Sequence, residues 1–147
     1  MTASQAIEGE HMSNQGKELV RRMYEEVWNR GDLGVVDEIC DSDYRGIGPY
    51  GNELGPEAVK RGVASRRAAF PDIHVSIEDM LVEGDKVAAR LTFAGKHRGP
   101  FQGIEATGKR VQWSGIWIYR IADGRFVERW HSYDMLGLLR QIGGVTT

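Results

Sequence analysis

The hydrophobic pattern of this chain changes its period once, at about Pro71, and this change constrains the fold more than any other feature. Before Pro71, apolar residues recur at spacings of three and four, which is typical of amphipathic helices. After Pro71, they recur at every second position, which is typical of half-buried strands. Helices followed by strands, without strand–helix–strand alternation, predict an α+β fold with an antiparallel sheet.

The first half of the sequence predicts three helices. The first covers residues 13–31 and ends at Gly31, and the second is a shorter helix after Asp32, which can serve as its cap. The third covers residues 56–70, with Pro56 in its first turn. Residues 1–12 are interpreted as an N-terminal extension and 13–147 as one domain, and the polar, glycine-rich residues 41–55 are interpreted as a connecting passage.

The second half predicts four strands joined as a meander, at about 73–82, 87–94, 111–121 and 125–133, followed by a short helix at 135–141. Asp123-Gly124 is a strong hairpin signal between the last two strands. In the first strand, Ile77 and Leu81 are expected on the apolar face, and Met80 on the other.

Charge and composition make several classes of function and location improbable. The net charge of −2 argues against binding to nucleic acid, which usually needs a basic excess. No apolar run approaches the roughly 18 residues of a membrane span, and residues 1–12 lack the features of a secretory signal. With Cys40 as the single cysteine, the sequence predicts a cytoplasmic protein without a membrane partner.

Two possible cofactor signals in the sequence do not support a cofactor. Residues 46–51 spell G-x-G-x-x-G, but the strand before and the helix after that a dinucleotide site requires are not predicted, so a loop is expected. The four histidines are far apart, and no metal-binding spacing is present. The sequence therefore predicts neither a nucleotide nor a metal.

One face of the third strand is strongly aromatic, with Trp113, Trp117 and Tyr119 in register around Gly115. Such a face can be packed core, or it can form the wall of a ligand cavity. Composition is compatible with both interpretations. Gly115 has no side chain to fill the space between the two tryptophans, which slightly favours a cavity.

The fourth strand places Arg129, His131 and Tyr133 on one face, opposite Phe126 and its alternating partners. His131 is either a structural histidine or a general acid or base, because imidazole titrates near neutral pH. Asp134 could orient it if the chain bends there.

Basic residues on other elements are further candidates for binding an anion. Arg90, on the second strand, could stabilise an oxyanion or could form an ion pair. On the third helix, a solvated face is the favoured interpretation of the basic residues, and an anionic partner is the weaker alternative; these residues are Lys60, Arg61, Arg66 and Arg67.

Several segments resemble the SnoaL-like polyketide cyclases, a family with the NTF2-like α+β cone fold. The matching segments are YEEVWNRGDL at 24–33, AFPD at 69–72, GKHRGPFQGI at 95–104, TG at 107–108 and GLLRQIG at 137–143. The resemblance implies a curved antiparallel sheet closed by three helices, a deep apolar pocket and a homodimer formed across the sheet.

The resemblance also implies cofactor-free chemistry, in which an aspartate removes a proton next to a carbonyl for an intramolecular aldol condensation. His131 stands at the position of that aspartate, and Gly46 and Trp117 stand at two further polar pocket positions. We therefore expect proton transfer on a small apolar carbonyl compound, with His131 as base or acid, Asp134 as its orienting partner, and Arg90 or Arg129 as oxyanion stabiliser. The expected pocket residues are Tyr24, Trp28, Tyr44, Trp113 and Trp117.

Two alternatives stay open at this point. One is water addition to an epoxide, as in limonene-epoxide hydrolase, a fold relative, with Arg90, Arg129, His131 and Asp134 forming a reduced acid–base set. The other is a non-catalytic protein that holds a small apolar ligand in the same cavity.

Overall fold

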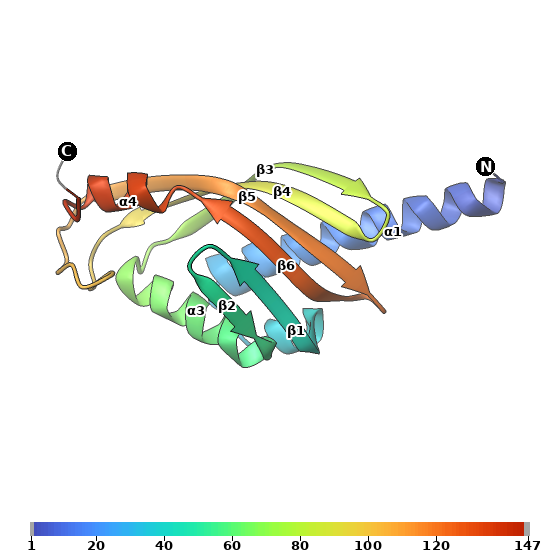
Figure 1. Cartoon of the computed structure of the whole chain (residues 1–147), viewed down its shortest axis with the longest axis horizontal. Helices are drawn as coiled ribbons and strands as arrows, with labels where there is room; N and C mark the ends of the chain where they lie inside the picture. Colours follow the sequence, from blue (N-terminus) through green and yellow to red (C-terminus); the bar gives the residue numbers. More distant parts are fainter. Residues whose placement is uncertain (1, 146–147) are drawn as a thin grey trace.

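A curved sheet forms one side of the molecule, and helices α1 and α3 lie along its inner side (Figure 1). The computed structural model describes residues 2–145, apart from the side chain of Met12. The helices are α1 (Ala3–Arg21), the π-helix η1 (Arg22–Asn29), α2 (Val35–Ile39), α3 (Gly55–Ala69) and α4 (Met135–Gln141). The strands are β1 (Cys40–Gly48), β2 (Gly51–Leu54), β3 (His74–Glu83), β4 (Lys86–Lys96), β5 (Arg110–Ala122) and β6 (Arg125–Tyr133). This order confirms the predicted α+β class.

The sheet has the strand order β2-β1-β6-β5-β4-β3. Strands β3 to β6 form the predicted antiparallel meander, and Asp123 and Gly124 both have positive φ, as the tight β5–β6 turn requires. Residues 41–55 are not a connecting passage, because most of them form the β1–β2 hairpin. Strand β1 pairs parallel with β6, so the sheet is mixed rather than wholly antiparallel.

Two irregularities in the sheet reverse the faces expected from simple alternation. In β3 the register shifts between Ile77 and Asp79, so Leu81 is 70% exposed while Met80 packs against the core. A second shift, between Arg120 and Ile121, brings Phe126 into the core on the same side as Arg129. One extra residue exchanges the two faces of a strand, so the predicted faces of Leu81, Met80 and Phe126 were wrong.

The first helix begins ten residues earlier than predicted, at Ala3. The side chain of Thr2 accepts a hydrogen bond from the backbone N–H of Gln5, and the Gln5 side chain accepts one from the backbone of Thr2. This capping box explains why the segment interpreted as an extension is helical. Its exposed N-terminal end projects beyond the sheet (Figure 1). Among residues 2–145, no helix has the length and apolarity that a bilayer crossing demands.

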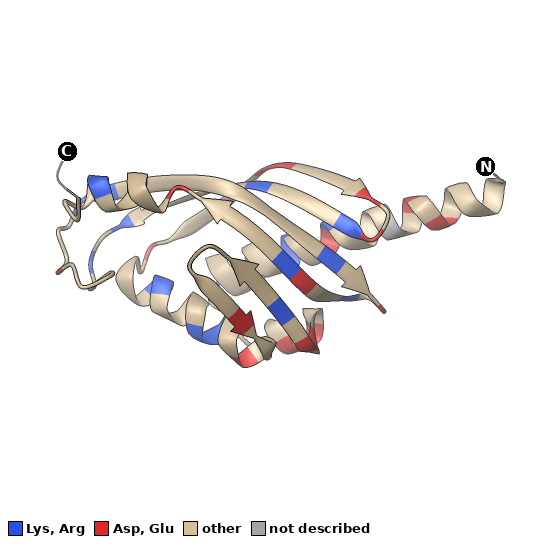
Figure 2. Cartoon of the chain, viewed as in Figure 1, with Lys and Arg blue, Asp and Glu red and all other residues tan. Residues whose placement is uncertain are grey.

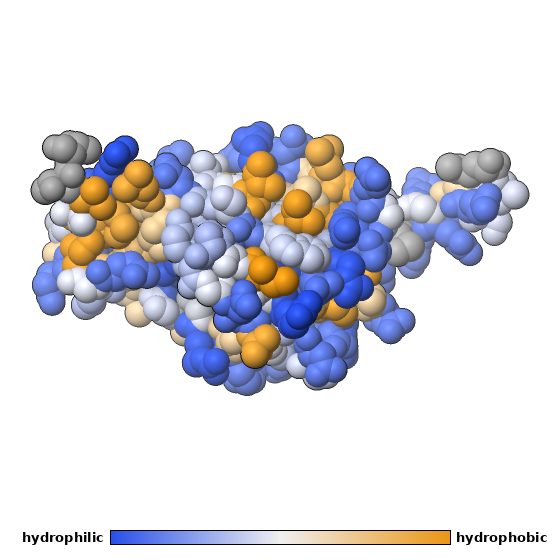
Figure 3. Space-filling view, in the orientation of Figure 1, coloured by the Kyte–Doolittle hydropathy of each residue, from blue (hydrophilic) through white to orange (hydrophobic). Residues whose placement is uncertain are grey.

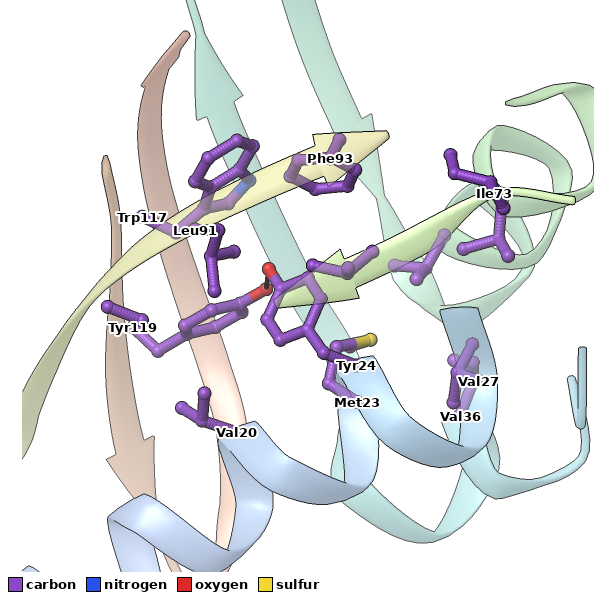
Figure 4. Close-up of a cluster of buried hydrophobic side chains, with 14 of the residues drawn as sticks. Val20, Met23, Tyr24, Val27, Val36, Ile73, Leu91, Phe93, Trp117 and Tyr119 are labelled. Carbon is purple, nitrogen blue, oxygen red and sulfur yellow. Dashed lines mark hydrogen bonds between the residues drawn. The ribbon is translucent and has the colours of Figure 1, made fainter. Parts of the chain in front are cut away.

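Aromatic rings fill the space between η1 and the inner face of the sheet (Figure 4). The hydroxyls of Tyr24 and Tyr119 lie 2.6 Å apart, and burial raises the pKa of both phenols, so they stay neutral. Phe93 lies in the middle of this layer, 5.2 Å from Trp28 and from Trp117 and 5.3 Å from Trp113 between ring centres. The aromatic face of β5 is therefore mainly packed core.

Candidate active site

Strand β6 carries the polar groups of the candidate site. Arg129, His131 and Tyr133 follow one another at alternate positions on its inner face, as predicted. The imidazole of His131 meets two rings edge to face, with Trp117 at 5.6 Å and Tyr133 at 5.3 Å between ring centres. These contacts hold the ring of His131 in one orientation beside the aromatic core.

Two glycines of β1 make room for these side chains. A Cβ atom at Gly46 would lie 2.7 Å from Nη2 of Arg129, and one at Gly48 would overlap Nε2 of His131. Any larger residue would displace the guanidinium or the imidazole from its place against β1. The G-x-G-x-x-G segment thus belongs to a hairpin whose glycines allow close approach by β6, and no helix opens directly from it.

The environment of His131 disfavours its charged form. Burial lowers its pKa most, and the positive charges of Arg129 and Arg66 lower it further, to about 4. Its Nδ1 is buried and has no hydrogen-bond partner among the described residues. At neutral pH the imidazole is therefore uncharged and able to accept a proton.

Arg129 is the most deeply buried charge of the site, with 6% of its surface exposed. Its Nη1 donates to Oε1 of Glu53 in β2 at 3.1 Å, whereas its Nε has no partner within residues 2–145. Burial alone would lower the pKa of Arg129, but Tyr44, Tyr119 and Glu53 raise it, and the net direction is upward. The guanidinium therefore stays charged.

Arg66 reaches the same region from α3, which corrects its interpretation as part of a solvated face. Its Nη2 donates to the Tyr133 hydroxyl at 2.8 Å, and its guanidinium lies 4.7 Å from the ring centre of Phe101. The sequence did contain a signal, because Arg66 follows Val63 by three residues and precedes Phe70 by four, which places it on the apolar stripe of the helix.

A cavity of about 160 Å³ opens between η1, β2, α3 and β6. It is lined by Trp28, Glu53, Gly62, Val63, Ser65, Arg66 and Arg129. His131 is not among the lining residues, but the charges of two of them, Arg66 and Arg129, act on its imidazole. His131 instead lines a separate hollow of about 260 Å³ with Ile116, Ile118, Trp130 and Ser132. The cavity is smaller and more polar than the deep apolar pocket we expected, since pockets for drug-sized ligands usually measure about 300–1,000 Å³.

The five expected pocket residues divide into two groups. Trp28 lines the cavity and Trp117 contacts His131. Tyr24, Tyr44 and Trp113 are buried in the core instead. The inferred hollow at Gly115 is also not found, because a Cβ there would lie 2.6 Å from the Cβ of Tyr133, and the Tyr133 ring stacks on Trp117.

Two expected catalytic residues do not join His131. Arg90 is exposed on the outer face of β4, because the buried neighbours Ala89 and Leu91 take the inner face. The Asp134 carboxylate accepts a hydrogen bond from the Gly137 N–H at 2.8 Å and so caps α4. The predicted placement of Arg90 and Asp134 beside the imidazole is therefore wrong.

The curved sheet, with helices and polar side chains on its inner side, agrees with the NTF2-like α+β cone fold that the sequence resemblance implies. Residues 18–142 match the family described as SnoaL-like polyketide cyclase. The chain therefore belongs to the SnoaL-like polyketide cyclase family, as its motifs indicated.

Individual relatives agree with this assignment. The chain is 35% identical over 130 residues to aklanonic acid methyl ester cyclase DnrD of Streptomyces peucetius, a match that covers 86% of this chain and 89% of the relative. It is 31% identical over 122 residues to nogalonic acid methyl ester cyclase of Streptomyces nogalater, covering 79% and 89% of the two chains. The structure of TsrD from Streptomyces laurentii matches with a TM-score of 0.82 at 33% identity, over 90% of this chain and 97% of that one. This membership supports an enzyme of the cyclase or isomerase type.

Proposed function

We propose that this protein catalyses proton transfer at a carbon next to a carbonyl group, without a cofactor, and that His131 accepts the proton. The observation that carries the proposal is an uncharged, half-buried imidazole beside two guanidinium groups. Because the chain belongs to a polyketide cyclase family and two relatives are named as methyl ester cyclases, we infer a polyketide substrate with an acidic C–H bond between carbonyls.

The chemistry follows from these groups as an intramolecular aldol condensation. His131 takes a proton from the carbon, and the electrons of the C–H bond form an enolate whose oxygen is stabilised by Arg66 or Arg129. The enolate carbon then bonds to a second carbonyl carbon of the same molecule. The resulting alkoxide takes the proton back from the imidazolium, so the enzyme returns to its starting state.

The proposed reaction requires that a substrate can reach His131. Arg66 is bonded to the Tyr133 hydroxyl, and the ring of Tyr50 in the β1–β2 turn lies 5.5 Å from that of Tyr133. The proposed polyketide substrate would not fit within the 160 Å³ cavity, because pockets for ligands of drug size usually measure about 300–1,000 Å³. We infer that the turn moves outward when substrate binds, which brings the substrate against the imidazole.

The proposal is tested by hydrogen–deuterium exchange in a simple diketone. The purified protein is mixed with benzoylacetone in D2O, and the loss of the signal of the central C–H is followed by NMR against buffer alone. We expect exchange faster than in buffer, in proportion to protein concentration. Exchange at the buffer rate, together with unchanged diketone bound to the protein in native mass spectrometry, would favour the non-catalytic binder.

The epoxide alternative has less support than proton transfer. It needs a carboxylate that activates water next to an arginine, yet Asp134 caps α4 and Arg90 lies on the outer face. Formation of a diol from limonene epoxide would nevertheless favour it.

The cytoplasmic location, and the expectation of no metal, nucleic acid or membrane partner, stay predictions. Cys40, the single cysteine, is buried as a free thiol, and burial raises its pKa to about 12. A thiol of this kind is unreactive, so we assign no chemistry to it.

We also propose that a second copy of this chain covers the outer face of the sheet. Ile116 and Ile118 are exposed on β5, and Leu81 is exposed on β3. Leu81 and Ile118 also line a hollow of about 780 Å³ at the β3–β4 turn, whose lining includes the charged residues Glu83, Asp85 and Lys86. The space-filling view shows several hydrophobic patches among the hydrophilic residues of this face (Figure 3). Charged residues of both signs lie on β1, β5 and β6 in the same view (Figure 2), and Glu128 accepts hydrogen bonds from Arg45 and Arg120.

Replacing Ile116 by arginine is expected to make the protein monomeric. Ile116 is 52% exposed, so the new charge costs little in the monomer but would be buried between two copies. Size-exclusion chromatography with light scattering checks the mass, with Leu136→Arg on α4 as an exposed control. A monomeric parent protein, or a dimeric variant, would contradict this proposal.

A further inference from the structure

The cavity beside His131 holds more positive than negative charge. Its lining contains the guanidinium groups of Arg66 and Arg129 but a single carboxylate, that of Glu53. His131, which lies outside the lining, contributes no charge at neutral pH. The lining therefore carries one uncompensated positive charge in a partly buried space.

Both guanidinium groups have N–H donors that are not paired with a carboxylate. Arg129 uses Nη1 on Glu53, while its buried Nε has no partner among the described residues. Arg66 donates to the neutral hydroxyl of Tyr133, and no carboxylate within residues 2–145 forms an ion pair with it. A buried guanidinium is normally matched by an anion, which its planar donors bind in a bidentate manner.

We propose that this cavity binds a carboxylate group attached to an aromatic ring of the substrate, so that the enzyme prefers a free acid to its methyl ester. This rests on the proposed function and names its substrate class. Trp28 supplies an apolar wall for the ring, and the volume suits a carboxylate with part of a ring better than a polycycle. Methyl esters, which the names of the cyclase relatives specify, present no negative charge to these arginines.

A bound carboxylate would also act on His131. The charged groups that act on the imidazole are Arg129 on its own strand and Arg66 from α3. The phenol of Tyr133 meets the imidazole edge to face and accepts the hydrogen bond from Arg66. An anion on the two arginines would offset their repulsion and move the pKa of His131 back toward its usual range. Substrate binding would then make the imidazole a stronger base.

The test compares benzoate with methyl benzoate and benzamide, two uncharged compounds of similar shape. Binding to the full chain is measured by calorimetry, and the His131 ring signals are followed by NMR titration with and without benzoate. We expect benzoate to bind at least tenfold more tightly than either neutral compound and to raise the pKa of His131.

Substitutions on α3 locate the effect. Arg66→Met should abolish the preference for benzoate, while Arg61→Met, which removes an exposed arginine from the same helix, should leave it in place. If Arg66→Met does not fold, Arg66→Lys replaces it and should reduce the preference, because the ammonium group lacks the planar donor pair.

Several outcomes would overturn the inference. These are equal binding of benzoate and methyl benzoate, no detectable binding of benzoate, or an equal loss in the Arg61 and Arg66 variants. The proposed function is tested by a different readout, the rate of exchange in benzoylacetone. His131→Gln should retain the preference for benzoate, so the binding of benzoate can be measured independently of that rate.

Discussion

Replacing His131 by glutamine should lower the rate of proton exchange in benzoylacetone by about 100-fold or more. Glutamine keeps a polar side chain of similar length, but its amide has no nitrogen that accepts and returns a proton. General acid–base groups contribute about 10²- to 10⁴-fold to enzymatic rates, so the loss should be at least at the lower end of that range. NMR exchange rates and the free energy of unfolding would be measured on the same preparations.

The matched control is His74→Gln, which makes the same chemical change at an exposed position of β3. It should exchange at the parental rate. If His131→Gln is folded and retains more than half of that rate, His131 is not the proton acceptor.

The lowered pKa of His131 adds a dependence on pH with a defined sign. The unfolded chain binds the proton near pH 6.5, whereas the folded protein resists it down to about pH 4. Between these values the unfolded state binds more protons, so the free energy of unfolding falls as the pH falls through this window. The exchange rate should be constant above about pH 5 and fall around pH 4, and His131→Gln should lose this part of the pH dependence of stability.

Replacing Phe93 by alanine should lower the free energy of unfolding by about 3–5 kcal/mol. Phe93 is almost fully buried on β4 and contacts the rings of Tyr24, Trp28, Trp113 and Trp117. Its removal loses the burial of one large ring and the geometry of several ring pairs. Since domains are usually stable by 5–15 kcal/mol, the variant should be close to unfolding at room temperature.

Urea unfolding followed by tryptophan fluorescence measures this effect, and Phe93→Leu serves as a control that keeps most of the volume. The leucine variant should cost clearly less than the alanine variant. This experiment also examines the packing of the interior. If Phe93→Ala lowers the free energy of unfolding by less than about 1.5 kcal/mol, the interior already contains a cavity and the neighbouring rings can move to fill the space left by Phe93.

The long periodic elements of the fold were predictable because their own residues determine them. The β3–β6 meander and α4 follow from alternation, turn residues and local spacing. The β1–β2 hairpin was not predicted, because its inner side has Gly46 and Gly48 where a strand usually has apolar side chains. Its pairing partner, β6, lies about eighty residues away in the sequence, so no local pattern indicates that the two strands pair.

The candidate site was predictable to a similar degree. Alternation placed Arg129 and His131 together, but it could not show that Glu53 of β2 pairs with Arg129 of β6 across the intervening strand β1. Arg66 was assigned to a solvated face because a charged residue on a helix is usually exposed, although its position on the apolar stripe was visible in the sequence. Asp134 directly precedes a helix, a position where a carboxylate more often caps the backbone than orients a histidine.

Because β1 and β2 are held to the sheet through the parallel pairing of β1 with β6, the site can open before the rest of the fold unfolds. The meander from β3 to β6 is held by pairings between strands adjacent in sequence, whereas β1 and β2 form the outer edge next to β6. An edge hairpin detaches more easily than the centre of a sheet. Fraying of β1 and β2 would uncover Arg129 and His131 while the other strands stay paired, so loss of binding on heating can precede cooperative melting.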